Sequence, residues 1–104
     1  GAELADANLS GADLSSAYLE YVNLSDAILI GADLPDATLT GAKIINANLT
    51  NANLANVWGP GVFTGGADLS YANLTNAYFA NNNLTNTTLC NTTMPDRSTN
   101  NDDC

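Results

Sequence analysis

The 104-residue chain has no histidine and only two basic side chains, Lys43 and Arg97. It therefore lacks the commonest general base and the commonest metal ligand of proteins. Eleven acidic residues give a formal net charge of −9, and a surface of that sign repels the phosphate backbone of nucleic acids. We therefore expect no nucleic-acid binding.

Other signs of chemistry are also missing. No serine or threonine is set apart as a nucleophile, and the glycines lack the spacing of a phosphate-binding loop. The segment from Asp96 to Asp102 alternates acidic and polar residues as a calcium loop does, but Asn101 stands where that loop requires glycine. We predict no catalytic residues, no metal site and no cofactor, and we expect that the protein is not an enzyme. No run of eighteen apolar residues occurs, so no membrane span is predicted.

What the chain does contain is a large apolar residue at almost every fifth position. Seventeen such residues follow this period between Leu4 and Met94, and fourteen of them are leucine. A small residue, usually alanine, stands two positions before each, and the other positions carry mostly Asp, Asn, Ser, Thr and Gly. A fixed internal period of this kind is typical of repeat architectures.

The spacing excludes both a helix and a plain strand. Five residues advance about 500° on an α-helix, so successive leucines would not share a face, and a strand requires a period of two. Apolar residues here alternate in steps of two and three, from Ala12 to Leu14 to Ala17 to Leu19. A two-residue strand followed by a turn predicts one short side of a coil, and coils stacked about 4.8 Å apart would pair their backbones.

The unit Ala-(Asp/Asn)-Leu-x-x, as in Ala12-Asp13-Leu14-Ser15-Ser16, resembles the motif of the pentapeptide-repeat proteins. The resemblance covers residues 1–54 and 67–96. It implies an all-β fold, a right-handed quadrilateral parallel β-helix of about five coils that is roughly 24 Å long. Residues twenty apart would then stack, so that Leu14, Leu34 and Leu54 form one core column. We assign the solenoid to 1–96 and a C-terminal tail to 97–104.

Residues 55–66 break the pattern. The five-residue period falls on Gly59 and Thr64, neither of which is large and apolar, and a Gly-Pro-Gly turn separates the aromatic residues on either side. We predict a loop that bulges from the coil wall. It either covers a gap in the wall or binds a protein partner, because loops on a regular scaffold often carry function. The candidate binding residues are Trp58, Gly59, Pro60, Gly61 and Phe63.

Four tyrosines fall at outward positions of the repeat: Tyr18, Tyr21, Tyr71 and Tyr78. In the twenty-residue register, Tyr18 and Tyr78 share one face if the break adds no net turn. Scattered surface aromatic residues are usual, whereas a contiguous patch would indicate a partner. The sequence leaves both interpretations open.

The two cysteines are Cys90, beside Leu89 of a late repeat, and Cys104, the last residue. They are either two free thiols or one disulfide, and we favour the disulfide because it would tie the polar tail back. A persistent disulfide implies an oxidising compartment. The C-terminal stretch from Cys90 to Asp96, with its Asp-Asp-Cys ending, also resembles the ends of thylakoid-lumen pentapeptide-repeat proteins. That resemblance implies the thylakoid lumen of a cyanobacterium or a chloroplast, and the disulfide alone would equally fit the periplasm, so we expect one of these two compartments.

The chain opens within a repeat, at Gly1 to Leu4, without the polar cap that solenoid ends need. We therefore expect an upstream segment that carried the targeting signal.

The acidic residues allow two interpretations. Seven of the eleven lie within residues 1–36, and the register places Asp6 near Asp26 and Asp13 near Asp33. They form either a solvated face or a mimic of DNA phosphates, since some pentapeptide-repeat proteins resemble a duplex and inhibit DNA gyrase. We favour the solvated face because the predicted rod spans only about seven base pairs. The leading hypothesis is a non-enzymatic interaction or scaffold protein of unknown partner, and the alternative is an acidic DNA mimic that inhibits gyrase.

Overall fold

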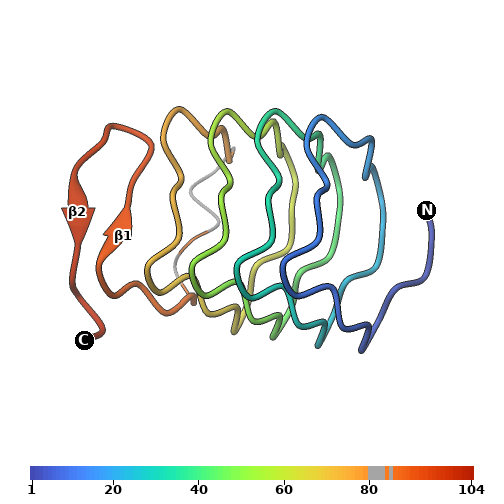
Figure 1. Ribbon diagram of the computed structural model, residues 1–104, viewed down its shortest axis with the longest axis horizontal. Coiled ribbons are helices and arrows are strands. Elements are labelled where there is room, and N and C mark those ends of the chain that lie inside the picture. Colours follow the sequence, from blue (N-terminus) through green and yellow to red (C-terminus); the bar gives the residue numbers. More distant parts are fainter. Residues whose placement is uncertain (80–83, 85) are drawn as a thin grey trace.

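The computed structural model describes residues 1–79, 84 and 86–104. The chain winds into coils that stack along one axis, with the N-terminus at one end and the C-terminus at the other (Figure 1). In the described part of the chain, every isolated β-bridge is parallel and joins residues twenty apart, from Glu3 and Asn23 to Asn73 and Thr93. Four pentapeptides therefore complete one turn.

Each side of a coil pairs with the next coil through backbone hydrogen bonds. The N–H of Leu14 donates to the carbonyl oxygen of Asp33 at 2.7 Å, and the N–H of Asp33 donates to the carbonyl oxygen of Ala12 at 2.9 Å. A pentapeptide has room for one such step before the chain turns. The walls are consequently built from single bridges and not from long strands.

The stacked coils enclose an apolar core that runs along the axis. Leu34 and Leu54 of the predicted column are buried, and Leu14 packs against this core from the first coil, where the leucines are only partly buried. Full burial of one leucine side chain contributes about 2 kcal/mol relative to exposure. Each buried leucine of the repeat therefore contributes to the stability of the stacked coils.

The corners of the coil require a left-handed backbone. Corner residues such as Asp6 and Gly11 have φ values of 63° and 68°, which Asp, Asn and Gly adopt more readily than other residues. Where Asp or Asn stands before the leucine, its side chain can also stabilise the turn by accepting a hydrogen bond from the backbone N–H two residues on. The Oδ1 atom of Asn73 accepts from the N–H of Thr75 at 3.0 Å.

The predicted loop at 55–66 is wrong, because these residues continue the coil. Trp58 forms parallel bridges with Thr38 on one side and with Tyr78 on the other. Val57 and Val62 are buried in the position that alanine occupies elsewhere. The wall passes through this segment without a bulge.

Phe79 of the next coil explains why this coil stays closed although Gly59 replaces the axial leucine. A Cβ atom added to Gly59 would lie 3.2 Å from Cδ1 and Cε1 of Phe79, so the phenyl ring occupies space that a leucine at 59 would fill. At the following axial position Thr64 is only 3% exposed, and its side chain is small enough to remain inside. The larger residue in one coil thus compensates for the missing side chain in its neighbour.

The C-terminal end forms a small hairpin. Strand β1 (Thr92–Thr93) pairs in antiparallel fashion with β2 (Thr99–Asn100), and the two lie side by side at the end of the stack (Figure 1). The Cα atoms extend over 32 × 22 × 21 Å, which is longer than the expected 24 Å because the hairpin adds to the coils. Residues 80–83 and 85 of the predicted solenoid lie outside the described residues.

Candidate interaction surface

One wall of the solenoid carries a column of aromatic side chains. The residue before each axial position points outward, because side chains alternate along a strand. On this wall the outward residues are linked in order by parallel bridges. They are Tyr18, Thr38, Trp58 and Tyr78, and we call them the aromatic column.

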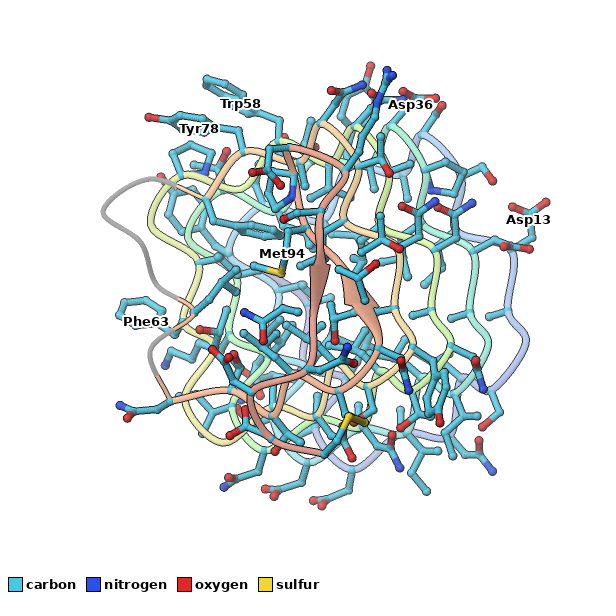
Figure 2. The ribbon with its side chains drawn as sticks, turned by 90° about the vertical axis from the view of Figure 1, so that its left-hand side faces the viewer. Asp13, Asp36, Trp58, Phe63, Tyr78 and Met94 are labelled. Atoms are coloured by element: carbon cyan, nitrogen blue, oxygen red, sulfur yellow. A yellow bond between two sulfur atoms is a disulfide. The ribbon has the colours of Figure 1, made fainter. Side chains whose placement is uncertain are left out.

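Two rings of the aromatic column stack on each other. The ring centroids of Trp58 and Tyr78 are 4.5 Å apart and the ring planes differ by 15°. Both side chains project from the same wall, away from the core (Figure 2), and they are 52% and 45% exposed. Such a pair is worth about 0.5–1.5 kcal/mol beyond its buried area. It forms a fixed apolar feature on a largely polar surface.

Thr38 interrupts the aromatic column between Tyr18 and Trp58. Its Oγ1 donates a hydrogen bond of 2.7 Å to Oε2 of Glu20, which holds this carboxylate beside the gap. Tyr18, on the far side of the gap, is 86% exposed. Since each coil adds about 4.8 Å, the backbones of Tyr18 and Trp58 are about 10 Å apart.

The structure does not gather the predicted binding residues into one loop. Trp58 belongs to the aromatic column, Gly59 faces the axis, Pro60 and Gly61 form the corner, and Phe63 lies exposed on the next wall. The partner of Trp58 is Tyr78, one coil further along, and the sequence analysis missed this pair. The twenty-residue register would have identified it, because Trp58 and Tyr78 are twenty positions apart and therefore lie in adjacent coils.

Two hollows lie near these aromatic residues. One of about 540 Å³ is lined by Ile45, Val62, Phe63, Thr64, Gly65, Gly66 and Asn86. Another of about 330 Å³, at the C-terminal end of the core, is lined by Ala77, Tyr78, Phe79, Leu84, Met94 and Pro95. Within the described ranges, no group of three or more His, Cys, Asp or Glu residues is placed to hold a metal ion. The same residues include no helix long and apolar enough to cross a membrane.

Acidic residues occupy the N-terminal part of a different wall. Asp13 and Asp33 pair in consecutive coils, as the register predicts, but Asn53 and Asn73 follow them. The Oγ and the N–H of Ser15 donate to Oδ1 of Asp13 at 2.7 and 3.1 Å, and these bonds hold the pKa of Asp13 below its ordinary value. The carboxylates are exposed, and the charged part of this wall extends over two coils.

The tail covers the C-terminal end of the solenoid. Cys90 and Cys104 form a disulfide, with their Cα atoms 4.8 Å apart. The N–H of Leu89 donates to Oδ2 of Asp103 at 2.9 Å, and the N–H of Asp103 donates back to the carbonyl oxygen of Leu89 at 3.0 Å. These bonds satisfy backbone groups of Leu89 near the end of the stack.

The sequence profile of the pentapeptide-repeat family matches residues 1–34, 17–56 and 65–94. The chain belongs to this family. A pentapeptide repeat protein of the Arabidopsis thaliana thylakoid lumen is similar in structure, with a TM-score of 0.69, 32% identity, and coverage of 84% of this chain and 57% of that one. Rfr23 from the cyanobacterium Cyanothece 51142 gives a TM-score of 0.72 and 38% identity over 82% of this chain and 54% of that one. This pentapeptide-repeat protein thus spans little more than half the length of these two structures.

A more distant structure shares the fold alone. QnrB1, a plasmid-mediated fluoroquinolone resistance protein, has a TM-score of 0.55 and 17% identity over 85% of this chain and 47% of its own. No curated protein matches the sequence. The family assignment confirms the resemblance seen in the repeats and implies a right-handed quadrilateral β-helix. Pentapeptide-repeat proteins are generally structural or interaction proteins without catalytic activity.

Proposed function

We propose that this pentapeptide-repeat protein is a non-enzymatic interaction or scaffold protein, a rod of about five coils that binds a protein partner through the aromatic column. The supporting observation is the exposed, stacked pair of Trp58 and Tyr78 on a hydrogen-bonded wall. Tryptophan and tyrosine are enriched among the residues that dominate binding energy at interfaces. A surface held in place by stacked coils also loses little conformational entropy when it binds.

We further propose that the protein works in an oxidising compartment, the thylakoid lumen or the periplasm. The disulfide between Cys90 and Cys104 supports this assignment, because such bonds persist where thiols are not kept reduced. The similarity to a protein of the Arabidopsis thaliana thylakoid lumen supports it independently.

The test is crosslinking and affinity capture from cells of the source organism. The wild-type protein is compared with a Trp58→Ala/Tyr78→Ala variant and with Tyr71→Ala, which removes an exposed tyrosine at a corner outside the aromatic column. We expect the same partner to be captured by the wild type and by Tyr71→Ala, and to be lost with the double variant. Equal recovery by all three, with unchanged circular dichroism, would contradict the aromatic column as the binding surface.

The paired acids support one alternative, a DNA mimic that inhibits DNA gyrase. Asp13 and Asp33 stack in consecutive coils, but neutral asparagines continue the column. The longest extent of 32 Å corresponds to about nine base pairs of duplex. A supercoiling assay separates the two functions, because potent inhibition of gyrase would favour the mimic over the scaffold.

A further inference from the structure

Building on the proposed function, we propose that the aromatic column binds an arginine side chain of a basic partner protein. The guanidinium would sit over Thr38, between the rings of Tyr18 and Trp58, and would pair with the carboxylate of Glu20. The partner is thus defined by its chemistry, an exposed arginine within a positively charged segment.

The spacing of the coils fits a cation between the two aromatic residues. Tyr18 and Trp58 are separated by two coils, about 10 Å at the backbone, and a cation is attracted to a ring when it lies within about 6 Å of the ring centroid. Measured along the axis, the gap at Thr38 lies one coil, about 5 Å, from the backbone of Tyr18 and one coil from that of Trp58, so a guanidinium over Thr38 can approach both rings. Tyr78 stacks on Trp58 and restricts its indole ring, so less side-chain freedom is lost when the site is filled.

The charges around the gap match a basic ligand. The hydrogen bond from Thr38 fixes the Glu20 carboxylate at the gap, and the remaining lone pairs of this carboxylate can accept the forked donors of a guanidinium. Asp36, a corner residue two positions before Thr38, lies on the same side of the molecule as Trp58 (Figure 2). Lys43 belongs to the neighbouring wall, where it pairs with Phe63. The net charge of −9 adds long-range attraction for a positive partner.

This combination favours arginine over lysine. Arginine is planar and weakly hydrated, stacks on aromatic faces and donates two parallel hydrogen bonds to a carboxylate, whereas lysine is a compact and strongly hydrated charge. Citrulline has nearly the shape of arginine but carries no charge. Comparing how tightly the site binds arginine, lysine and citrulline therefore distinguishes the contribution of charge from those of planar stacking and of hydrogen-bond geometry.

The site contains its own reporter, because Trp58 is the only tryptophan in the chain. Purified protein is titrated at low salt with tetra-arginine, tetra-lysine and tetra-citrulline peptides, none of which absorbs or emits where tryptophan does. We expect a saturable change in Trp58 fluorescence with tetra-arginine. Binding of the other two peptides should be at least about fivefold weaker, as the loss of one cation–π contact or one ion pair implies.

Matched variants locate the bound side chain. Glu20→Gln should weaken tetra-arginine binding about fivefold, and Glu3→Gln less than about twofold, although both remove one negative charge. Glu3 is a suitable control because it lies on the neighbouring wall, where its carboxylate accepts a hydrogen bond from Nδ2 of Asn23 and does not face the gap at Thr38. Thr38→Tyr should abolish binding, because the new ring fills the gap even though it enlarges the aromatic surface.

Several results would overturn the proposal. They are equal affinity for the three peptides, equal losses in Glu20→Gln and Glu3→Gln, tighter binding by Thr38→Tyr, or no fluorescence change. If these occur while capture of the cellular partner still depends on Trp58, only the arginine assignment fails. If capture of the cellular partner also does not depend on Trp58, both the arginine assignment and the proposed binding function of the aromatic column fail.

Discussion

Gly59 and Phe79 fill one space between them, so the effects of substituting them should not be additive. Gly59→Leu restores the leucine of the repeat but drives it toward the Phe79 ring, which already lies 3.2 Å from the first added carbon. Overpacking of this kind costs about 1–3 kcal/mol. Phe79→Leu alone leaves Gly59 facing a void and should cost about 1–2 kcal/mol.

The double variant Gly59→Leu/Phe79→Leu places a leucine at each axial site, as Leu19 and Leu39 do on the same wall. Gly59 is not among the residues with positive φ, so leucine meets no left-handed backbone strain there. Additive costs would sum to about 2–5 kcal/mol. We expect the double variant to lie within about 1 kcal/mol of the wild type, which is a favourable coupling of at least about 1 kcal/mol.

The assay is urea denaturation followed by far-UV circular dichroism and by fluorescence of Trp58, the residue next to Gly59. Coincident transitions would justify the two-state analysis that the comparison needs. Phe63→Leu is the control, because Phe63 is exposed and should change stability by less than about 0.5 kcal/mol. Simple additivity in the double variant would refute the idea that one ring serves two coils.

The remaining predictions concern a corner, a carboxylate and the terminal disulfide. Gly41→Ala should destabilise the protein more than Gly31→Ala in parallel denaturation, although both have left-handed φ, because a Cβ at Gly41 would lie 2.5 Å from the Tyr21 ring and nothing lies within 4 Å at Gly31. Ser15→Ala should raise the pKa of Asp13 toward 3.8 in a carboxyl NMR titration. Because the folded pKa is depressed, the stability that the ionised Asp13 contributes is present above pH 3.8 and is lost as the pH falls below it. Reduction of the disulfide should lower stability by up to about 3 kcal/mol and leave the upstream coils folded; identical melts with and without reductant would contradict this.

The architecture followed from the sequence because one rule governs almost every residue. A five-residue leucine period fits neither a helix nor a plain strand, so it predicts a coil. The coil places Asp13 beside Asp33, as observed. The failure at 55–66 has the opposite cause. Gly59 looks like a break when its own coil is considered alone, whereas the residue that compensates for it, Phe79, is twenty positions later.

The candidate surface was only partly predictable for the same reason. The sequence singled out Trp58 and placed Tyr18 and Tyr78 on one face provided that the break added no net turn. Because the coil is continuous, that condition holds, and Trp58 joins the two tyrosines in one column. The ring stacking and the bond from Thr38 to Glu20 depend on side-chain torsions, which the repeat does not specify.

In this fold a residue's functional neighbours are the residues one coil before it and one coil after it, more than its neighbours in the chain. The two chain neighbours of Trp58, Val57 and Gly59, face the core, whereas its bridge partners Thr38 and Tyr78 share its outward position. A substitution at Thr38 should therefore alter what Trp58 binds without altering the core, while a substitution at Gly59 should alter stability first. The separation of these two effects follows from the alternation of side chains across a strand, and it allows the surface to vary column by column on an unchanged scaffold.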